Sequence, residues 1–481
     1  MDKKLANNAI FNIIYKLLNV LFPLITSAYV SRVLLADGVG KVEYARNFAT
    51  IFVFIAALGI PAYGTKIIAS LKNEKNQSLI DKAFSELLII IMCSSLICVI
   101  IYSIIIRLDS KFNQDLLLFT VTGIQILLVS INIDWLYQGK EIYKYITIRS
   151  FLVKLISLAC IFLLVKQKSD YIIYALIISL GVAGNNIFNI LYARKFVHFT
   201  LKKINLKPHI LPVIYLLLST IAGELYSKID ILMLGHYSTG TTIGFYSNAV
   251  KTINAILTGV TAITAVYLPR LSLLVNENNE KFKKLVNEGV ELIGFISIPV
   301  MIGMIVVSDI FVNTMFGEAF SKTSLTVQIL SPLIVIKGIG DLINYQVIIS
   351  IDKEKYFIVT TSIAAIINIA LNSFLIPKYL QNGAAIASVV SELIVNVGML
   401  FVSSKIVSLK IDLRYWISLL VSSLLMAVIV FVFTNMIATQ NIIKVIISVL
   451  LGGIIYLLSN VIIKNKILYC QHRFQFDRKR R

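Results

Sequence analysis

Apolar runs of about 20 residues recur along the whole length of this chain, and they constrain its fold more than any other feature. A run of that length is what an α-helix needs to cross the hydrocarbon of a bilayer. The apolar residue types make up 58% of the 481 residues and the charged types only 15%, which is outside the usual range of soluble domains. The sequence therefore predicts an all-α polytopic membrane protein.

About fourteen such runs can be placed along the sequence, and short connections separate them. Three of them, 87–106, 171–193 and 415–443, contain no charged residue. The first run follows two lysines and shows no small-residue cleavage site, so we expect it to be kept as a helix. The predicted spans are 9–35, 42–70, 84–107, 115–138, 144–165, 171–195, 211–235, 243–270, 285–308, 323–350, 355–377, 383–404, 412–435 and 441–463.

The positive charge of the chain is unevenly distributed among the connecting loops. The chain has 45 Lys and Arg against 25 Asp and Glu, a formal net charge of +20. An even number of spans puts both termini on one side, where the loops and tail hold 30 of the basic residues against 8 on the other side. This asymmetry predicts that both termini, including the basic tail 472–481, are cytoplasmic. It accounts for the net charge without nucleic-acid binding.

A weak internal repeat relates the two halves of the chain. Setting residue n against n+204 aligns Gly40 with Gly244 and Tyr63 with Tyr267, although such sparse identity could also arise by chance. The offset corresponds to six spans, so both copies begin on the same side of the membrane, as in parallel repeats. The repeat predicts one six-helix bundle at 1–207, a second at 208–408, and two further helices with the tail at 409–481.

The sequence contains no signature of catalysis or metal binding. The four histidines lie in predicted loops or in the tail, and none belongs to an HExxH motif. Three of the four cysteines lie in apolar runs, where small core residues are the ordinary interpretation. A phosphate-binding glycine loop would need a strand-to-helix turn, which the predicted spans do not offer. We therefore predict that the protein is not an enzyme and has no cofactor and no metal.

Charged residues inside the apolar runs are the main indication of a function. Each costs roughly 2.5–3.5 kcal/mol at the centre of a lipid-exposed helix, so we expect it to face a protein-lined or water-filled interior. Three acid–base pairs have the spacing that places partners on one helical face, and each could neutralise itself or line a cavity. These pairs are Glu43 with Arg46, Glu224 with Lys228, and Lys337 with Asp341.

Other intramembrane charges have no partner at that spacing. Lys154 and Lys251 have no acid within four residues, and Lys251 lies roughly 12 Å from the outer end of its helix at 1.5 Å per residue. Lys251 is therefore the better cavity candidate, whereas Lys154 could extend along its stem to the membrane surface. Asp134, Asp230 and Glu392 are acids in apolar runs that could bind a coupling cation or accept a hydrogen bond between helices.

Uncharged polar residues adjoin these charges. Asn47 and Thr50 follow Arg46, and Asn248 lies near Lys251. Such faces suit a sugar, which offers many hydroxyls and little charge. Prolines that could kink the helices are Pro23, Pro61, Pro299 and Pro332.

A resemblance to a known family is carried by residues 15–70, YKLLNVLFPLITSAYVSRVLLADGVGKVEYARNFATIFVFIAALGIPAYGTKIIAS. They resemble the first two helices of polysaccharide flippases, the Wzx-type O-antigen and capsule repeat-unit translocases of the multidrug/oligosaccharidyl-lipid/polysaccharide (MATE-like) exporter superfamily. Residues 224–253, ELYSKIDILMLGHYSTGTTIGFYSNAVKTI, resemble the seventh and eighth helices. The likeness covers nearly the whole chain. One departure is Leu34-Leu35, where the family usually has Leu-Gly before the acidic turn.

The resemblance implies two pseudosymmetric six-helix bundles around a central cationic cavity, plus two C-terminal helices. The implied substrate is a polyprenyl diphosphate, here undecaprenyl diphosphate, that carries an oligosaccharide repeat unit. We expect alternating access driven by an ion gradient in the bacterial cytoplasmic membrane, with membrane lipids, a glycan polymerase and a chain-length regulator as partners. The candidates for the cationic cavity are Arg32, Arg46, Lys228, Lys251 and Lys337. The candidates for a coupling-ion site are Asp134, Asp230, Glu224 and Glu392.

Three other classes of protein stay open on the sequence alone. A drug/cation antiporter of the same fold would be expected to have an acid-dominated cavity, whereas this chain has at least as many intramembrane bases as acids. A membrane glycan polymerase or glycosyltransferase would need a sizeable loop outside the membrane, and the longest outer loop, about 308–322, is short. The third class is a scaffold for a glycan-assembly complex.

Overall fold

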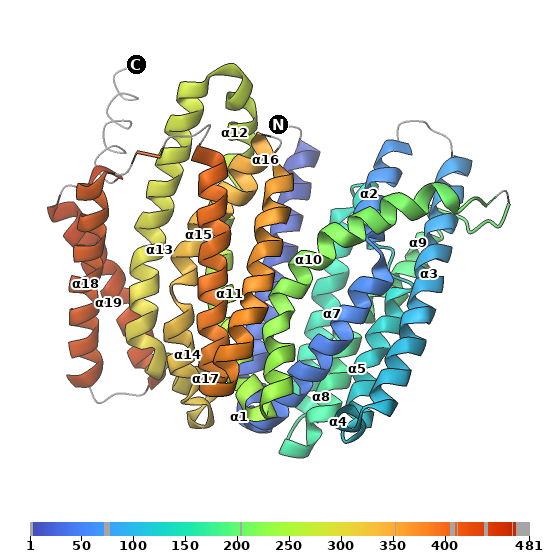
Figure 1. Cartoon of the computed structure of the whole chain (residues 1–481), viewed down its shortest axis with the longest axis horizontal. Coiled ribbons are helices and arrows are strands. Elements are labelled where there is room, and N and C mark those ends of the chain that lie inside the picture. Colours follow the sequence, from blue (N-terminus) through green and yellow to red (C-terminus); the bar gives the residue numbers. More distant parts are fainter. Residues whose placement is uncertain are drawn as a thin grey trace. The chain divides into compact units, whose positions relative to one another are not determined.

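The computed structural model describes residues 3–71, 77–202, 204–351, 353–404, 409–410, 412–436, 441–463 and 465–467. Every regular element in these residues is a helix (Figure 1), so the predicted all-α class is confirmed. The chain divides into two compact units, residues 1–244 and 245–481. The predicted division at 207 and 408 follows the internal repeat and stays a prediction.

The first unit begins with a long kinked helix and ends at the start of α11. Its helices are α1 (Lys3–Ala57), α2 (Ile60–Leu71), α3 (Gln77–Leu108), α4 (Ser110–Asn113), α5 (Leu116–Val129), α6 (Asp134–Gly139), α7 (Tyr143–Leu164), η2 (Lys168–Asp170), α8 (Tyr171–Ala183), α9 (Asn185–Ala193) and α10 (Lys207–Tyr237).

The second unit takes in the rest of α11 and ends with two separate spans. Its helices are α11 (Gly240–Thr264), α12 (Tyr267–Glu277), α13 (Asn279–Phe316), η3 (Glu318–Phe320), α14 (Thr323–Leu330), α15 (Leu333–Asp341), η4 (Leu342–Val347), α16 (Ile348–Ser350), α17 (Glu354–Ser404), α18 (Leu413–Met436) and α19 (Asn441–Ile462).

The helices are long and apolar enough for a multi-pass membrane protein. Ten spans in the described residues meet that condition, and the bent pair Gly240–Thr264 with Tyr267–Val275 makes eleven. Two of the ten, Phe22–Leu71 and Lys355–Ser404, have 50 residues each and contain a kink. At 1.5 Å per residue, 50 residues cover about twice the ~30 Å of a bilayer's hydrocarbon, so each can cross twice. This arrangement is consistent with fourteen spans.

The two kinks are made by leucines in a backbone conformation that favours glycine. Leu35 in α1 has φ 56° and ψ −177°, and Leu380 in α17 has φ 52° and ψ −129°. A positive φ brings the β-carbon of an L-residue close to its own backbone, which a branched side chain rarely tolerates. The family's usual glycine at the position of Leu35 is therefore explained by the turn, and this chain makes the same turn with a leucine.

A second type of break occurs at matching places in the two halves. In the first, α1 ends at Ala57 and α2 begins at Ile60 after Leu58 and Gly59, both of which have positive φ. In the second, α11 ends at Thr264 and α12 begins 41° off its axis at Tyr267. The breaks at 58–59 and 265–266 are 207 residues apart, close to the offset of the sequence repeat. The likeness of the two breaks supports that repeat.

Two of the four predicted prolines lie where a helix changes direction. Pro61 occupies the first turn of α2, and Pro332 lies between α14 and α15. Proline is tolerated at these places because the first residues of a helix have no intrahelical partner for their N–H groups. Pro23 and Pro299 lie inside the continuous α1 and α13.

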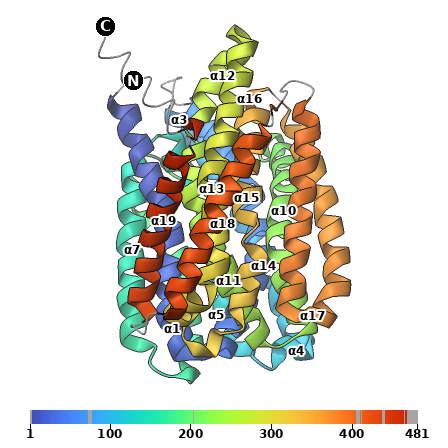
Figure 2. The same cartoon turned by 90° about the vertical axis from the view of Figure 1, so that its left-hand side faces the viewer.

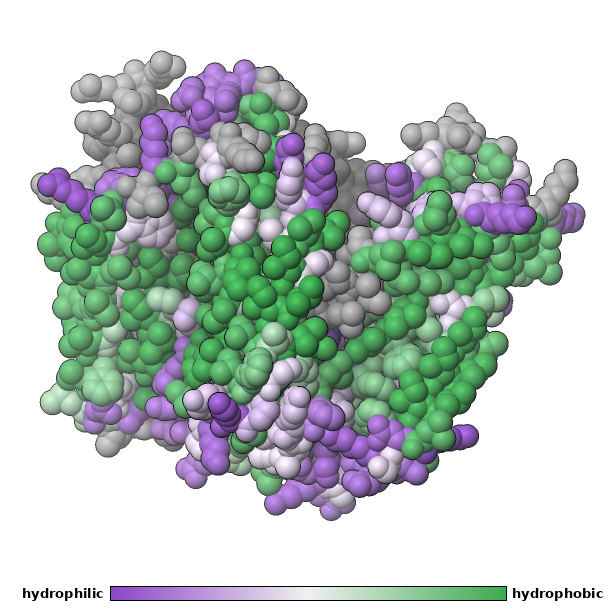
Figure 3. Space-filling model, viewed as in Figure 1, coloured by the Kyte–Doolittle hydropathy of each residue, from purple (hydrophilic) through white to green (hydrophobic). Residues whose placement is uncertain are grey.

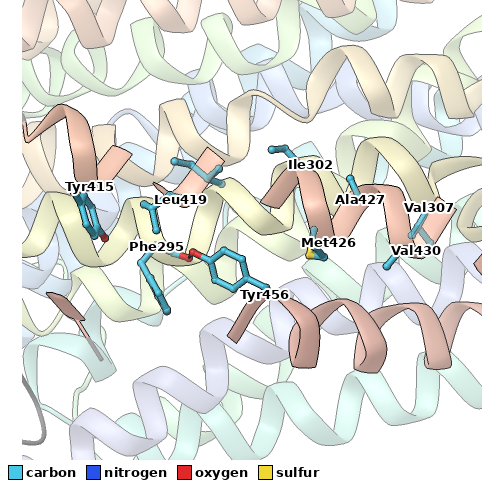
Figure 4. Close-up of a cluster of buried hydrophobic side chains, with 10 residues drawn as sticks. Phe295, Ile302, Val307, Tyr415, Leu419, Met426, Ala427, Val430 and Tyr456 are labelled. Carbon is cyan, nitrogen blue, oxygen red and sulfur yellow. Dashed lines mark hydrogen bonds between the residues drawn. The ribbon is translucent and has the colours of Figure 1, made fainter. Parts of the chain in front are cut away.

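The last two helices pack on α13 through an apolar cluster (Figures 2 and 4). Phe295 and Ile302 of α13 face Leu419 and Met426 of α18, and Tyr456 of α19 closes the cluster. The Tyr456 hydroxyl donates a hydrogen bond of 2.7 Å to the carbonyl of Phe295, so this polar group stays satisfied inside the membrane. The cluster fixes α18 and α19 to the second unit.

Exposed apolar side chains cover the middle of the helices. On the face shown in Figure 3 they lie between hydrophilic ends in both units. On α3 they form a row of Leu96, Ile97, Ile100, Ile101 and Ile104. Such large apolar surfaces are expected where a protein meets lipid.

Candidate functional site

An ion pair between the buried Arg149 and the partly exposed Asp134 joins two helices of the first unit. Asp134 begins α6 after a non-helical break that follows α5, and Arg149 lies on α7. Arg149 Nη1 donates to Asp134 Oδ1 at 2.9 Å and Nη2 donates to Oδ2 at 3.3 Å. Asn189 Nδ2 of α9 donates to the same Oδ1 at 2.7 Å. The carboxylate of Asp134 is thus fixed by two helices, and Arg149 is only 7% exposed.

A polar cavity of about 200 Å³ adjoins this pair. Besides Asp134 and Arg149 it is lined by amide side chains, namely Gln125, Asn132, Asn185 and Asn186. The Nε of Arg149 and the Oδ1 of Asn185 are buried without a hydrogen-bond partner among the described residues. Buried polar atoms normally find a partner in protein, water or a ligand, so the cavity is suited to a small polar guest.

The ion pair of Asp134 with Arg149 bears on whether the cavity can bind a cation. The coupling-ion role predicted for Asp134 stays a prediction, but a cation there would have to compete with the guanidinium of Arg149. Arg149 was not among the predicted site residues, although it lies inside the predicted span 144–165. The signal for its true place was the unmatched acid Asp134, which requires a base from a neighbouring helix.

The second unit contains a comparable polar cluster around the end of α15. Lys337 Nζ lies 3.3 Å from Glu392 Oε2 of α17, in an ion pair between two helices. Asp341 accepts hydrogen bonds from Thr264 Oγ1 of α11 and, at 3.3 Å, from Gln346 Nε2. The sequence pairs Lys337 with Asp341 on one helical face. The ion pair of Lys337 joins it instead to Glu392, because α17 packs beside α15.

The helix changes its winding directly after Asp341. Residues Leu342–Val347 form a π-helix, a form that occurs frequently at functional sites. Asn344 Nδ2 in this segment donates to Asn396 Oδ1 of α17 at 3.3 Å. Gly340 allows the close approach, since a β-carbon there would lie 1.9 Å from Asn396 Oδ1.

The two polar clusters share one spacing along the chain, three residues longer than the 204-residue offset of the predicted repeat. Asp341 follows Asp134 by 207 residues, and Asn396 follows Asn189 by the same 207. The breaks at 58–59 and 265–266 share this offset. Each half therefore brings an acid and an asparagine of equal spacing into the interior of its bundle.

The pair predicted between Glu43 and Arg46 is confirmed. Arg46 Nη2 lies 3.2 Å from Glu43 Oε2, and Arg46 is 27% exposed whereas Glu43 is 3% exposed. The polar residues beside it bond within their own helix: Asn47 Nδ2 donates to the carbonyl of Glu43 and Thr50 Oγ1 to that of Arg46, both at 2.7 Å. Their described hydrogen bonds are thus the ordinary intrahelical ones.

The remaining candidates are divided between the two units. Three of them belong to the first unit. Arg32 on α1 is exposed, Lys228 on α10 is half-buried, and Asp230 on α10 is buried. Lys251, on α11 in the second unit, is half-buried. All four take part in interactions in the structure.

Whether these cations line one common cavity stays a prediction. The side chain of Glu224, and with it the predicted pair with Lys228, lies outside the described residues. Lys154 is half-buried and donates a hydrogen bond of 2.5 Å to Asn19 Oδ1 of α1. It therefore has a polar partner on another helix, although it has no acid within four residues of its own helix.

The loop after α10 is held by contacts that the sequence did not indicate. Lys111 Nζ donates to the carbonyls of Gly235 and His236 in the last turn of α10, and a lysine at that place also suits the helix dipole.

Two glycines lie where the backbone comes close to another part of the chain. A β-carbon on Gly40 would lie 1.7 Å from the carbonyl oxygen of Gly240, and one on Gly244 would lie 2.2 Å from that of Ala36. The glycines that align in the repeat therefore mark a close approach of backbone.

Another polar cluster that sequence reasoning missed lies at the start of α10. His209, expected in a loop, is buried there and lies 2.9 Å from Glu86 Oε2 through Nε2 and 3.0 Å from the Tyr63 hydroxyl through Nδ1. The backbone N–H of Asn205 donates to Glu86 Oε1 at 2.7 Å. These contacts fasten the connection between α9 and α10 to α2 and α3. In the described part of the chain, no group of three or more His, Cys, Asp and Glu side chains could hold a metal ion.

Comparisons with known proteins agree with this architecture. A family model described as "Polysaccharide biosynthesis protein" matches residues 5–275. The "Putative O-antigen transporter" of Escherichia coli (strain K12) is 25% identical over 410 residues, which are 82% of this chain and 96% of that protein.

Two solved structures share the fold. The lipid II flippase MurJ, in an inward closed conformation, has a TM-score of 0.68 at 17% identity, over 93% of this chain and 100% of MurJ. An inward-facing MATE family multidrug transporter of the MOP superfamily has a TM-score of 0.62 at 17% identity, over 80% of this chain and 94% of that one.

Proposed function

Because the chain belongs to the polysaccharide biosynthesis protein family, we propose that it is a flippase that translocates a lipid-linked glycan across the membrane. The observation that carries this proposal is the likeness to the O-antigen transporter over 82% of the chain. It extends far beyond residues 26–70 and 224–270, where the sequence resemblance is most specific. The fold shared with MurJ and with MATE family transporters is compatible with it.

The proposed substrate is an oligosaccharide repeat unit on undecaprenyl diphosphate, moved from the cytoplasmic to the outer leaflet by alternating access. A diphosphate is doubly charged or more, and it requires cations wherever it leaves water. Arg46, Lys228 and Lys251 are the residues that we assign to it, with Arg32 and Lys337 as further candidates. Arg46 is partly exposed beside Glu43, so its guanidinium keeps free donors for a phosphate.

We further propose that an ion gradient drives export. The acids available for a coupling ion are Asp134, Asp230, Glu224 and Glu392. Glu392 is favoured over Asp134, because its partner Lys337 is 38% exposed and the contact of a lysine is exchanged more readily than that of a bidentate arginine. The protein is expected to lie in the cytoplasmic membrane with both termini in the cytoplasm, as the distribution of lysines and arginines predicts.

The test is reconstitution of the purified chain into vesicles that contain a defined undecaprenyl-diphosphate oligosaccharide. A glycosidase that cannot cross the membrane cleaves only the lipid in the outer leaflet, so the cleaved fraction measures how much lipid has reached that leaflet. Translocation faster than in protein-free vesicles is expected, with no change in glycan length, since a polymerase would lengthen the glycan. If leaflet access does not change, a flippase is excluded and a scaffold for glycan assembly is favoured.

The cationic residues are tested in cells that lack their own flippase. Arg46→Ala, Lys228→Ala and Lys251→Ala should each lower surface glycan while the protein remains in the membrane at wild-type amounts. Wild-type glycan in all three variants would overturn the assignment of the diphosphate to these residues. A cation-coupled multidrug antiporter of the same fold is the alternative. It predicts that cells expressing the wild-type protein resist drugs to which cells without it are sensitive.

A further inference from the structure

A groove of about 770 Å³ opens between α7 and α9 on the outside of the first unit. Its length is lined by apolar side chains that are exposed in this chain, among them Ile148, Leu152, Ile156, Phe188 and Leu191. A volume of several hundred Å³ is typical of pockets that hold a small molecule. The groove is open at the surface of the first unit, and its exposed apolar side chains belong to helices long enough to cross the membrane, so they suit the acyl chain of a lipid.

One end of the groove is cationic and aromatic. Lys144 and Lys195 are exposed there, and neither makes an ion pair with the described residues. Tyr145 and Tyr192 stack at 4.1 Å between ring centroids, and the Nζ of Lys195 lies 5.1 Å from the Tyr192 centroid. Lysines on stacked aromatic rings at the membrane surface suit a negatively charged headgroup.

The inner wall of the groove is closed by Arg149. This residue lines both the groove and the polar cavity of about 200 Å³ inside the bundle, and its guanidinium is held by Asp134. The groove has no Asn, Gln, Ser, Thr, Asp or Glu in its lining, and its polar groups, on Lys144, Tyr145, Arg149, Tyr192 and Lys195, lie at one end and at the inner wall, so most of its length is apolar. This separates it from any path for a glycan and favours a simple lipid as its occupant.

We propose that the groove binds one anionic phospholipid, with an acyl chain along α7 and α9 and the phosphate between Lys144 and Lys195. The basic end lies on the side that the lysine and arginine distribution predicts to be cytoplasmic. The lipid's charge and shape complement the groove: two cations at the mouth, tyrosines at the level of the headgroup, and aliphatic side chains at the depth of the acyl chain. The site does not depend on what the protein translocates.

The experiment is native mass spectrometry of the full chain released from nanodiscs that contain equal amounts of phosphatidylglycerol and phosphatidylcholine. The wild type is expected to retain one phosphatidylglycerol. The double variant Lys144→Gln/Lys195→Gln should bind it about 30-fold more weakly, since each lysine near a membrane surface contributes roughly a fivefold preference for anionic lipid. Lys166→Gln/Lys168→Gln removes two exposed lysines beyond the other end of α7 and should leave binding unchanged.

A second variant keeps both lysines and fills the groove. Leu152→Trp should lower retention of phosphatidylglycerol, and a phospholipid with a photoreactive acyl chain should label peptides of α7 and α9 in the wild type but not in this variant. Labelling spread equally over all lipid-facing helices, or equal retention of both phospholipids, would overturn the site. If equimolar undecaprenyl phosphate displaces phosphatidylglycerol, the groove binds the lipid carrier instead, and the proposal of a phospholipid site is wrong.

Discussion

The polar clusters of the two units have acids and asparagines 207 residues apart along the chain, but they hold their acids in different ways. In the first unit, Asp134 receives two hydrogen bonds from the buried Arg149 and one from Asn189. In the second unit, Asp341 accepts from neutral side chains, and the base Lys337 contacts a different acid, Glu392. An arginine fork fixes a carboxylate in one geometry, whereas a lysine is a point charge on a flexible stem.

The difference indicates a division of roles between the two halves. A charge pair buried in a medium of low dielectric is held strongly, while a partly exposed pair is weakened by water. The second cluster also adjoins a π-helix and the bend between α11 and α12, both places where a helix is less regular. We expect the first cluster to contribute mainly to stability and the second to contribute mainly to transport.

The largest effect is expected for Arg149→Met. It leaves the carboxylate of Asp134, which is 22% exposed, without its cation, and the loss of one partner from a largely buried pair should lower the free energy of unfolding by about 3 kcal/mol. Lys337→Met in the second unit should lower it by about 1 kcal/mol or less, because that pair is partly exposed. Thermal unfolding of the purified variants in one detergent measures both.

A double variant controls for the stranded charge in the first unit. Asp134→Leu/Arg149→Met removes both partners and should recover most of the stability lost in Arg149→Met. Equal losses in Arg149→Met and Lys337→Met would contradict the proposed difference between the clusters.

Transport should respond in the opposite order. Glu392→Gln is expected to lower glycan export at least about tenfold with little loss of protein, because it removes a charge whose partner can be exchanged during a transport cycle. Asp134→Asn should lower export only as far as it lowers the amount of folded protein. Surface glycan divided by membrane protein amount is the measurement, in cells without another flippase.

The matched control for this comparison is Glu318→Gln, the same substitution at an exposed acid of the second unit. It should export glycan like the wild type. A normal export rate in Glu392→Gln would remove Glu392 as a coupling residue and leave Asp230 and Glu224 as the acids to test.

The helices could be predicted from the sequence because burial in a bilayer is a local requirement on each run of about 20 residues. The internal repeat stays a prediction, but the alignment of Gly40 with Gly244 has a physical reason, since each glycine lies where another part of the backbone comes too close for a β-carbon. The pair of Glu43 and Arg46 was correct because both partners lie on one helical face.

Partners on different helices could not be read from spacing. Lys337 has an acid four residues away, yet its ion pair is with Glu392, more than fifty residues further on. Arg149 has no acid within four residues, and His209 was expected outside the helices, although both are buried against acids of other helices. A local pattern shows that a charge needs a partner, but the choice of partner depends on which helices pack together.

A smaller effect is expected where the second cluster packs most closely. In Gly340→Ala the new β-carbon would lie 1.9 Å from Asn396 Oδ1, so the two segments must move apart. Overpacking of this kind lowers the free energy of unfolding by about 1–3 kcal/mol. The control is Gly259→Ala in α11, where a β-carbon meets nothing within 4 Å and the higher helix propensity of alanine should raise stability slightly. Thermal unfolding that does not separate these two variants would show that the contact to Asn396 is easily relaxed.

The smallest effect concerns the kinks, which again occur once in each half. Leu380 has a positive φ with a side chain 41% exposed, so replacing it with glycine relieves strain while little packing is lost. Relative to Leu380→Ala, which keeps the β-carbon, Leu380→Gly should be more stable by about 0.5–1 kcal/mol, since the relief exceeds the extra freedom of glycine in the unfolded chain. Leu35→Gly should raise the stability of the wild type less than Leu380→Gly does, because the side chain of Leu35 is half-buried and its packing is lost. Unfolding midpoints of these three variants and the wild type measure this difference, and a Leu380→Gly variant no more stable than Leu380→Ala would show that the kink is not strained.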